Sequence, residues 1–232
     1  LAPPLGFVIS MEGADPILDP DQLGEWHAAG LRLLGITHYG SGRYAGGTGT
    51  ELGLNAAGRA LLAEMESLGV VLDLTHCSDL AFWQALEHHR GVVLASHNNS
   101  RALVPSQRQF SDDQIQAIVE RDGVIGVALD AWMLASGWTI ADRLDPANPH
   151  VQLEHVVDQI DHICQLTGNS RHAAIGSDLD GGFGREQSPR DLDTIADLQK
   201  LPAMLAARGY GEADIAAIMH GNWLWLLRRV WT

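Results

Sequence analysis

Two apolar runs in the sequence each end on a histidine. VVLDLTH ends at His76 and GVVLASH at His97, and an earlier run, GFVISMEG, carries Glu12 near its end. Neutral imidazoles and carboxylates are ligands that Zn²⁺ and similar divalent ions prefer, and a catalytic zinc needs about three protein ligands and one open position for water. Glu12, His76 and His97 would supply such a set.

Three further runs also end on polar side chains, namely His38, Asp130 and Asp178. A lone histidine at the end of a strand is usually a hydrogen-bonded structural residue, and that interpretation suffices for His38 taken alone. A set of histidines and carboxylates that all end apolar runs is harder to explain in this way. The pattern therefore favours a shared site.

These runs alternate with longer amphipathic stretches. The helical stretches 55–69, 79–91 and 111–123 carry capping residues at their starts and glycine at their ends. Strands are expected at 6–13, 31–38, 70–76, 91–97, 123–130 and 173–182. Apolar strands separated by helices are typical of a parallel sheet in an α/β protein.

The placement of the polar residues separates two α/β architectures. Six strands that each contribute to one ring of residues are typical of a closed barrel, whereas an open sheet concentrates its site at one switch point. No GxGxxG or GxxxxGK[ST] phosphate loop follows any strand. We therefore expect a (β/α)₈ TIM-like barrel.

Six strands cannot close an eight-stranded barrel. The sequence opens with LAPPLGFVISMEG, which lacks an initiator Met and reaches a strand within a few residues. We expect that the first one or two β-strands are missing from this sequence. Residues 1–232 are then a single metal-dependent hydrolase barrel domain that is incomplete at its N-terminus.

Composition limits the partners. The 232 residues are 46% hydrophobic and carry a net charge of −14, which disfavours nucleic acid and anionic membranes as partners. No stretch is long enough to span a membrane, and two cysteines, Cys77 and Cys164, are too few for a disulfide framework. The compartment is left open, with a soluble, cytoplasmic protein slightly favoured.

Other features are explained without a catalytic role. The segment HYGSGRYAGGTG (38–49) predicts a long flexible loop, and NWLWLLRRVW (222–231) predicts a terminal helix packed on the barrel. The remaining histidines lie in helical or loop contexts, where surface or capping positions are expected: His27, His88, His89, His150, His155, His162, His172 and His220.

Four motifs together resemble one family. LGVVLDLTHCSD, VVLASHNNSRAL, the Glu of ISMEGADPI, and AIGSDLDGG are similar to segments of the membrane (renal) dipeptidases, the M19 metallopeptidases of the amidohydrolase superfamily. The resemblance covers nearly the whole chain. It implies a (β/α)₈ barrel with a two-zinc site that hydrolyses small dipeptides, and it suggests a homodimer.

The resemblance also implies roles for individual residues. Glu12 matches the carboxylate that bridges the two zinc ions, and His76 and His97 match the histidines of the second zinc. Asp178 matches the carboxylate that handles the proton of the attacking water.

Two further residues resemble the family's substrate-binding groups. His38 resembles the histidine that faces the scissile bond and stabilises the tetrahedral intermediate. Arg108 matches the arginine that binds the substrate carboxylate, although it stands in SQRQF where the family often has Arg-Asn.

One family motif is absent from this sequence. The first zinc of the family also takes a His-x-Asp pair, and no such pair precedes Glu12. Two Zn²⁺ ions are expected in the complete site, and the residues of one site are complete in this chain.

Three functions stay open. The first is a zinc dipeptidase. The second is another barrel amidohydrolase acting on N-acyl amino acids, lactones or other small amides, because metal ligands do not fix the substrate. The third is a catalytically silent relative, against which the presence of Asp178 argues.

Overall fold

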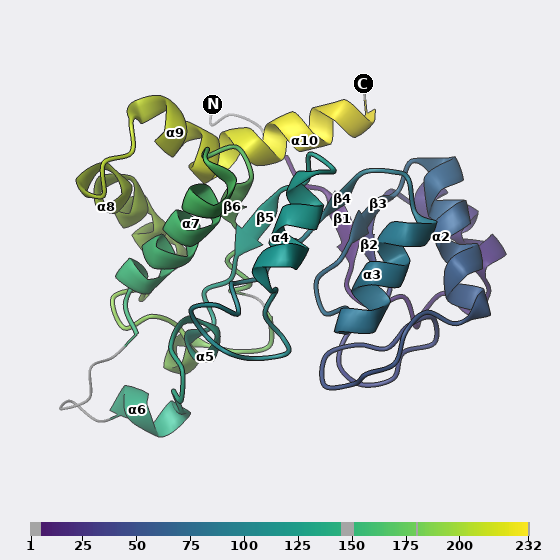
Figure 1. Cartoon of the computed structure of the whole chain (residues 1–232), viewed down its shortest axis with the longest axis horizontal. Coiled ribbons are helices and arrows are strands. Elements are labelled where there is room, and N and C mark those ends of the chain that lie inside the picture. The colour runs from purple at the N-terminus through teal and green to yellow at the C-terminus, as the bar shows by residue number, and fades with distance from the viewer. Residues whose placement is uncertain (1–5, 145–150, 180, 232) are drawn as a thin grey trace. The chain divides into compact units, whose positions relative to one another are not determined.

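The structure is a computed structural model that describes residues 6–144, 151–179 and 181–231. The chain divides into two compact units. The first unit comprises residues 1–94 with Trp231, and the second comprises residues 95–230. Each unit contains parallel strands with helices between them (Figure 1).

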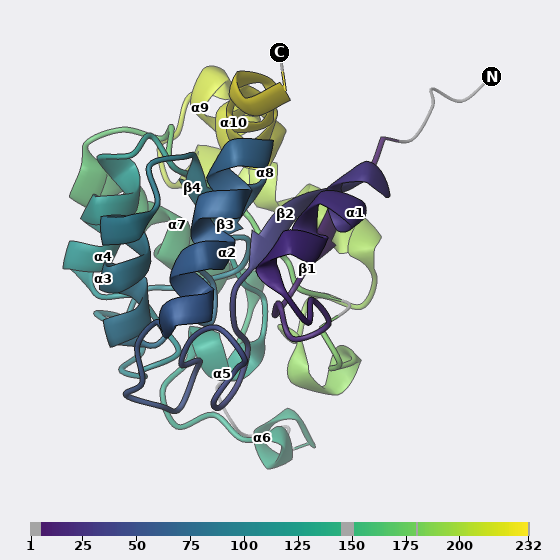
Figure 2. The same ribbon diagram turned by 90° about the vertical axis from the view of Figure 1, so that its right-hand side faces the viewer.

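The first unit is built on a four-stranded parallel sheet in the order β1-β2-β3-β4. Its strands are β1 (Ile9–Met11), β2 (Leu31–Gly35), β3 (Val71–Asp73) and β4 (Val93–Leu94), and its helices are η1 (Pro20–Gln22), α1 (Leu23–Ala28), α2 (Ala56–Leu68) and α3 (Asp79–His88). Helix α2 packs on β3 and on α3 (Figure 2). Strands β3 and β4 are wholly buried, whereas β1 is a half-exposed edge strand in which Ile9 is 43% exposed.

Local sequence signals explain where the helices of this unit begin and end. The Asn55 side chain accepts a hydrogen bond from the Gly58 amide at the start of α2, and Ser78 accepts one from the Ala81 amide at the start of α3. Helix α2 ends at Gly69, whose φ of 68° is easily adopted only by glycine.

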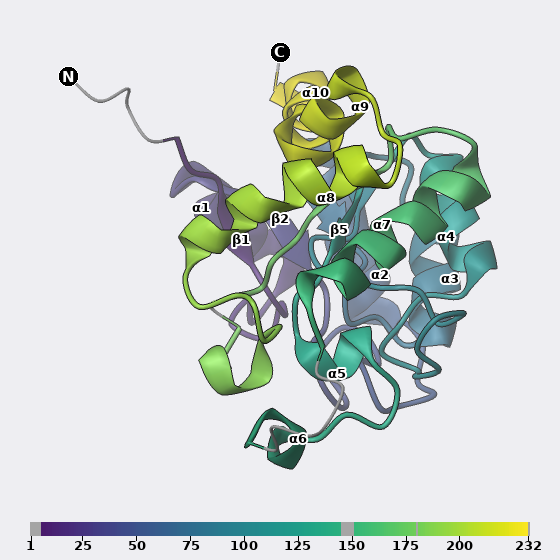
Figure 3. The same cartoon turned by 90° about the vertical axis from the view of Figure 1, so that its left-hand side faces the viewer.

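The second unit contains a pair of parallel strands, β5 (Ile125–Val127) and β6 (Ala173–Ile175). Helix α7 (Leu153–Thr167) packs on both strands and on α8 (Leu201–Ala207). Figure 3 shows α7 beside α8. The other helices are α4 (Asp112–Val119), α5 (Ala131–Leu134), α6 (Ile140–Leu144), η2 (Arg185–Gln187), η3 (Ile195–Lys200), α9 (Glu212–Ala216), the π-helical turn η4 (Ala217–Gly221) and α10 (Asn222–Trp231).

All six predicted strands form, but each is shorter than the apolar run that predicted it. The run 70–76, for example, contains only three strand residues, Val71–Asp73, because the chain leaves the sheet before His76. The same happens in the other runs. The polar residues at the ends of the runs therefore lie in the loops that follow the strands.

The glycine-rich segment is held by backbone hydrogen bonds, in contrast to the flexible loop that we expected. The Thr48 amide donates to the His38 carbonyl oxygen at 2.9 Å, and the Ser78 amide donates to the Gly46 carbonyl oxygen at 3.1 Å. A Cβ atom on Gly47 would lie 1.9 Å from the His38 carbonyl oxygen, so only glycine allows this close approach. Gly46 and Gly47 therefore allow this segment to pack closely against the residues that follow β2 and β3.

Two other expectations concern the C-terminal segment and the histidines. Helix α10 forms as predicted, and its Trp223 donates from Nε1 to the Ile175 carbonyl oxygen of β6 at 2.9 Å. His89 is buried but is the C-cap residue of α3, one of the two positions expected for it. His172 is buried, which is a correction to the surface or capping position expected for it. His150 lies outside the described residues.

The described helices also bear on the membrane question. None of them, within the ranges that the structure covers, is both long enough and apolar enough to cross a membrane.

Candidate metal centre and proton-transfer residues

The first unit brings three potential metal ligands together after its strands. Glu12 follows β1 directly, and His38 and His76 each lie three residues beyond the last residue of β2 and β3. Because parallel strands end at the same edge of a sheet, these side chains meet there. One donor atom from each of them lies within 4.8 Å of the others.

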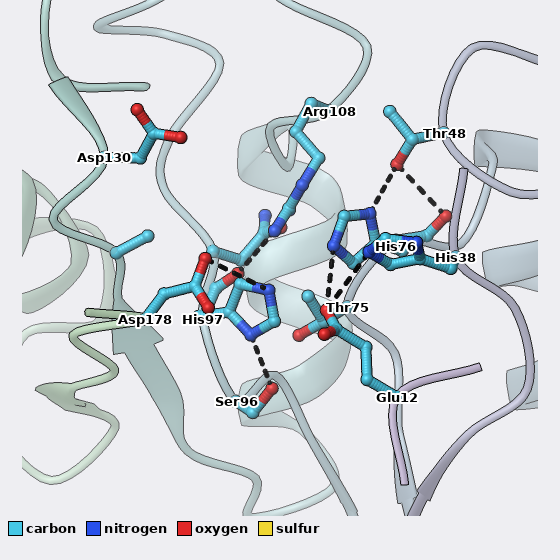
Figure 4. Close-up of polar contacts among 12 residues, drawn as sticks. Glu12, His38, Thr48, Thr75, His76, Ser96, His97, Arg108, Asp130 and Asp178 are labelled. Atoms are coloured by element: carbon cyan, nitrogen blue, oxygen red, sulfur yellow. Dashed lines mark hydrogen bonds and ion pairs between the residues drawn. The ribbon is translucent and has the colours of Figure 1, made fainter. Parts of the chain in front are cut away.

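The Glu12 carboxylate faces both imidazoles (Figure 4). Its Oε1 lies 3.0 Å from His76 Nε2 and 3.6 Å from His38 Nε2. His76 is 4% exposed in its side chain, whereas Glu12 and His38 are about half exposed. The cluster thus has a buried inner member and two members that solvent can reach.

Thr48 orients the inner histidine. Its Oγ1 lies 3.0 Å from His76 Nδ1 and donates to the His76 carbonyl oxygen at 3.3 Å. The Thr48 hydroxyl donates its only proton to the His76 carbonyl oxygen, so its oxygen can only accept from Nδ1. Nδ1 therefore carries the ring proton. The lone pair of His76 is then at Nε2, which faces Glu12.

This arrangement fits a bound cation. The Nε2 atom and the Glu12 carboxylate oxygen lie 3.0 Å apart, so they share either a proton, as an ion pair, or a metal ion to which both can donate a lone pair. Imidazole nitrogen with carboxylate oxygen is a donor set suited to Zn²⁺ and related ions. The residues present therefore fit a divalent metal.

The backbone of His76 adopts a left-handed conformation, with φ of 68°. Such a conformation is uncommon for a residue with a Cβ atom and costs on the order of 1–3 kcal/mol. Burial of the ring and its hydrogen bond to Thr48 oppose that cost. The strain sits at the residue that the sequence predicts as a ligand, as is common at functional sites.

Replacing Thr48 by valine is expected to weaken metal binding by about 10–100-fold, since outer partners that orient a histidine ligand typically contribute that much. Valine keeps the side-chain shape but cannot accept from His76 Nδ1. The measurement is the dissociation constant from competition with a chelator. Thr50→Val is the matched control, because Thr50 lies in the same loop and its Oγ1 donates to the Gly47 carbonyl oxygen at 2.8 Å. Equal affinity in both variants would contradict the role given to Thr48.

The second unit holds another histidine and carboxylate pair. His97 lies three residues beyond β4, and Asp178 lies three residues beyond β6. His97 Nε2 is 3.8 Å from Asp178 Oδ2, and His97 Nδ1 is 2.9 Å from Ser96 Oγ (Figure 4). This repeats the arrangement of His76, with a hydroxyl at Nδ1 and a carboxylate facing Nε2.

Asp178 has a constrained position of its own. Its φ is 54°, the left-handed region, and the Gly181 amide donates to its carbonyl oxygen at 2.9 Å. A Cβ atom on Gly181 would lie 2.3 Å from Asp178 Oδ1, so a side chain at 181 would displace the carboxylate. The GSDLDGG motif thus serves to turn Asp178 sharply out of β6. Asp180, of the same motif, lies outside the described residues.

Arg108 is buried against the loop that carries His97. It is 4% exposed, its Nη2 donates to the His97 carbonyl oxygen at 3.0 Å, and its Nη1 donates to Asn98 Oδ1. These charge-assisted bonds fix the backbone of His97. The Arg108 guanidinium therefore helps to position His97.

Burial raises the pKa of two other groups near the ends of strands, Asp130 and Cys77. Asp130, three residues beyond β5, accepts from Gln187 Nε2 at both carboxylate oxygens, and burial raises the pKa of its carboxyl. Burial also raises the pKa of the Cys77 thiol, with a further contribution from Asp73. A thiol so disfavoured as a thiolate is a poor nucleophile.

Sequence reasoning identified the ligand-type residues but not their partners. Glu12 and His76 meet as expected, and the structure adds His38, which we had assigned to the substrate, to the same cluster. His97 and Asp178 approach each other within the second unit. Thr48 and Ser96 were missed. Ser96 could have been found because it directly precedes His97, whereas Thr48 is 28 positions away from His76 and had no local signal.

Comparison with known proteins identifies relatives along almost the whole chain. The family model for membrane dipeptidase (peptidase family M19) matches residues 4–232. A Klebsiella pneumoniae protein described as "uncharacterized protein in pqqA 5′ region" is 32% identical over 98% of this chain and 83% of its own length. Dipeptidase aclJ of Aspergillus oryzae is 31% identical over 87% of this chain and 46% of its own length.

A solved structure is similar in fold. The metallo peptidase from Rhodobacter sphaeroides, crystallised with a phosphinate mimic of the dipeptide L-Ala-D-Ala, is 30% identical and aligns with a TM-score of 0.82. The alignment covers 97% of this chain and 63% of that one. The sequence predicted an α/β barrel, which is the fold class of the M19 proteins. The likeness to this solved structure confirms that prediction.

The chain therefore belongs to the membrane dipeptidase family, peptidase family M19. Its relatives include proteins described as dipeptidases and metallopeptidases. The chain spans only about half the length of aclJ and about two thirds of the Rhodobacter enzyme.

Proposed function

We propose that the protein is a zinc-dependent dipeptidase that uses two metal ions. The observation that carries the proposal is the approach of Glu12 Oε1 to His76 Nε2 at 3.0 Å, with the half-exposed His38 ring beside them, in a chain of the M19 family. His97 is proposed as a further ligand, because its Nε2 faces a carboxylate in the same manner as that of His76.

Different residues of this chain are proposed to carry out different steps of hydrolysis. Bound divalent ions would lower the pKa of water and polarise the peptide carbonyl. Asp178 is proposed to take the proton of the attacking water and to deliver it to the leaving amine. His38, whose ring is half exposed, is proposed to donate to the oxygen that becomes negatively charged.

The substrate is proposed to be a small dipeptide with a free carboxylate. Support comes from the Rhodobacter relative, which was crystallised with a mimic of L-Ala-D-Ala. A dipeptidase must recognise the carboxylate one residue away from the bond that it cleaves, and arginine is suited to this task because it can hold both carboxylate oxygens. We propose Arg108 for that role.

A second function is favoured by the burial of the same arginine. Arg108 is 4% exposed and donates to His97 and Asn98, so it could serve only to hold the His97 loop. Without a carboxylate clamp the site would suit an amidohydrolase acting on N-acyl amino acids, lactones or other small amides.

The experiment that separates these functions compares L-Ala-D-Ala and L-Ala-L-Ala with their C-terminal amides. A dipeptidase hydrolyses at least one of the free acids with a kcat/KM at least tenfold above that of its amide, because the amide lacks the charge that is recognised. Equal rates on acid and amide would contradict the dipeptidase and favour the general amidohydrolase.

Replacing Arg108 by alanine is expected to lower kcat/KM for the free dipeptide by about 1.5–3 kcal/mol in transition-state free energy, the contribution of a charge-assisted hydrogen bond. The rate on the corresponding amide should change little. The measurement is kcat/KM on both substrates, together with metal content.

Arg101→Ala is the matched control. Arg101 Nε donates to the Ser106 and Gln109 carbonyl oxygens of the same loop, so its loss should affect acid and amide equally. If Arg108→Ala also lowers both rates by the same factor, Arg108 positions His97 and does not bind the carboxylate.

A further inference from the structure

A pocket of about 380 Å³ lies in the second unit at the amino-terminal ends of β5 and β6. Asp122 and His172, which line it, come before Ile125 and Ala173, where these strands begin. Its other lining residues belong to α9, η4 and α10, and η4 packs on β6. Helices α9 and α10 are neighbours in Figure 1. Asp178 follows the carboxyl end of β6, so the pocket and the proposed proton acceptor belong to opposite ends of one strand.

His172 is a buried polar group that faces this pocket. It is 5% exposed, and its Nδ1 lies 2.9 Å from the Gly123 carbonyl oxygen. A carbonyl oxygen only accepts, so Nδ1 carries a proton and the neutral ring keeps its lone pair at Nε2. Within the described part of the chain Nε2 has no hydrogen-bond partner.

Asn222 supplies a second acceptor. It is 5% exposed, and its Nδ2 donates to the carbonyl oxygens of Ser170 at 2.7 Å and Ala173 at 2.8 Å, which uses both amide hydrogens. Its Oδ1 has no donor among the residues that the structure describes. His172 Nε2 and Asn222 Oδ1 are therefore two acceptors, on side chains that are themselves nearly buried, that remain available to a ligand with several N–H donors in this pocket.

The remaining lining residues add the Arg171 guanidinium, the Asp122 carboxylate, which pairs with Arg229 Nη1 at 3.5 Å, and apolar surface. Arg171 and His220 lie at the exposed rim. Ala213, Ala216 and Ala217 provide methyl groups, and Trp225 provides an aromatic ring over which the Arg229 guanidinium lies at 4.8 Å. A carboxylate would be attracted to Arg171, and an apolar side chain would pack against the alanines and Trp225.

We propose that this pocket binds a free α-amino acid with an apolar side chain. The ammonium group donates to His172 Nε2 and Asn222 Oδ1, the carboxylate lies towards Arg171, and the side chain packs against Trp225 and the alanine methyl groups. The pocket volume is ample for such a ligand. The proposal does not depend on dipeptidase activity, although free amino acids are the products that such an activity releases.

The test uses L-phenylalanine as the probe and two analogues that each lack one charge. Binding is measured by calorimetry, and the site is located from the imidazole ¹⁵N resonances of His172 in ¹⁵N-histidine-labelled protein. L-Phenylalanine should shift these resonances. N-acetyl-L-phenylalanine, without the ammonium, and L-phenylalaninamide, without the carboxylate, should bind at least tenfold more weakly.

Variants of exposed residues show whether the pocket is the site. Ala216→Phe fills the pocket from α9 and should weaken binding at least tenfold, whereas Ala206→Phe on α8, which is exposed and does not line the pocket, should leave it unchanged. Arg171→Gln, at the exposed rim, provides a second test that does not alter the walls and should also weaken binding.

Several results would overturn the proposal: unmoved His172 resonances, equal binding of N-acetyl-L-phenylalanine, or full affinity in both Ala216→Phe and Arg171→Gln. Because no dipeptide is present, these outcomes are independent of the hydrolysis assays.

Discussion

Replacing His76 by alanine is expected to lower metal affinity by more than about 100-fold and to abolish hydrolysis at ordinary metal concentrations. The imidazole is a direct member of the Glu12–His38–His76 cluster, whereas partners that only orient a ligand already contribute about 10–100-fold. Metal content after dialysis and kcat on a small dipeptide provide the measurement.

His88→Ala is the control for this variant. His88 lies on the exposed side of α3 in the same unit, so its loss removes an imidazole without touching the cluster. A His76→Ala protein that kept the metal content and the rate of the wild type would show that the metal is bound elsewhere.

Replacing Asp178 by asparagine is expected to lower kcat by roughly 10²–10⁴-fold while metal content stays near that of the wild type, because general acid–base catalysis contributes about this much. Asparagine keeps the shape of the side chain and the approach of Gly181, but it cannot accept the proton of water. The measurement is kcat with metal content determined on the same sample.

Asp130→Asn is the matched control, since Asp130 follows β5 as Asp178 follows β6, and its carboxylate is already engaged by Gln187. We expect it to retain a rate within a few-fold of the wild type. Full activity in Asp178→Asn would transfer the proton-accepting role to another carboxylate, with Asp180 as the next candidate to be replaced.

The strands and the residues that follow them could be predicted from the sequence for a simple physical reason. Strands such as β3 are buried on both faces, so they leave an uninterrupted apolar run that ends where the chain leaves the sheet. His38, His76, His97, Asp130 and Asp178 each come three residues after a strand ends, so each interrupts such a run. The helix boundaries were predictable in the same way from Asn55, Ser78 and Ser111, whose side chains cap the helices that follow.

The partners of these residues could not be predicted, because they depend on contacts between distant segments. Thr48 reaches His76 only because Gly46 and Gly47 allow the loop to pack closely, and composition alone indicated a flexible loop. From the sequence, Arg108 could equally be a solvated loop arginine. In the structure it is buried against Asn98 and His97. The same holds for His172, which is buried and whose Nδ1 donates to the carbonyl oxygen of the distant Gly123.

The central claim is that hydrolysis of a free dipeptide depends on metal held by this chain. The most direct measurement is the rate of L-Ala-D-Ala and L-Ala-L-Ala hydrolysis by protein stripped with a chelator and then titrated with Zn²⁺, with bound metal counted per chain at each step. The account predicts that the stripped protein is inactive and that activity on at least one dipeptide returns as zinc binds, up to two ions per chain. Full activity in the stripped protein, or zinc binding without any return of hydrolysis, would contradict it.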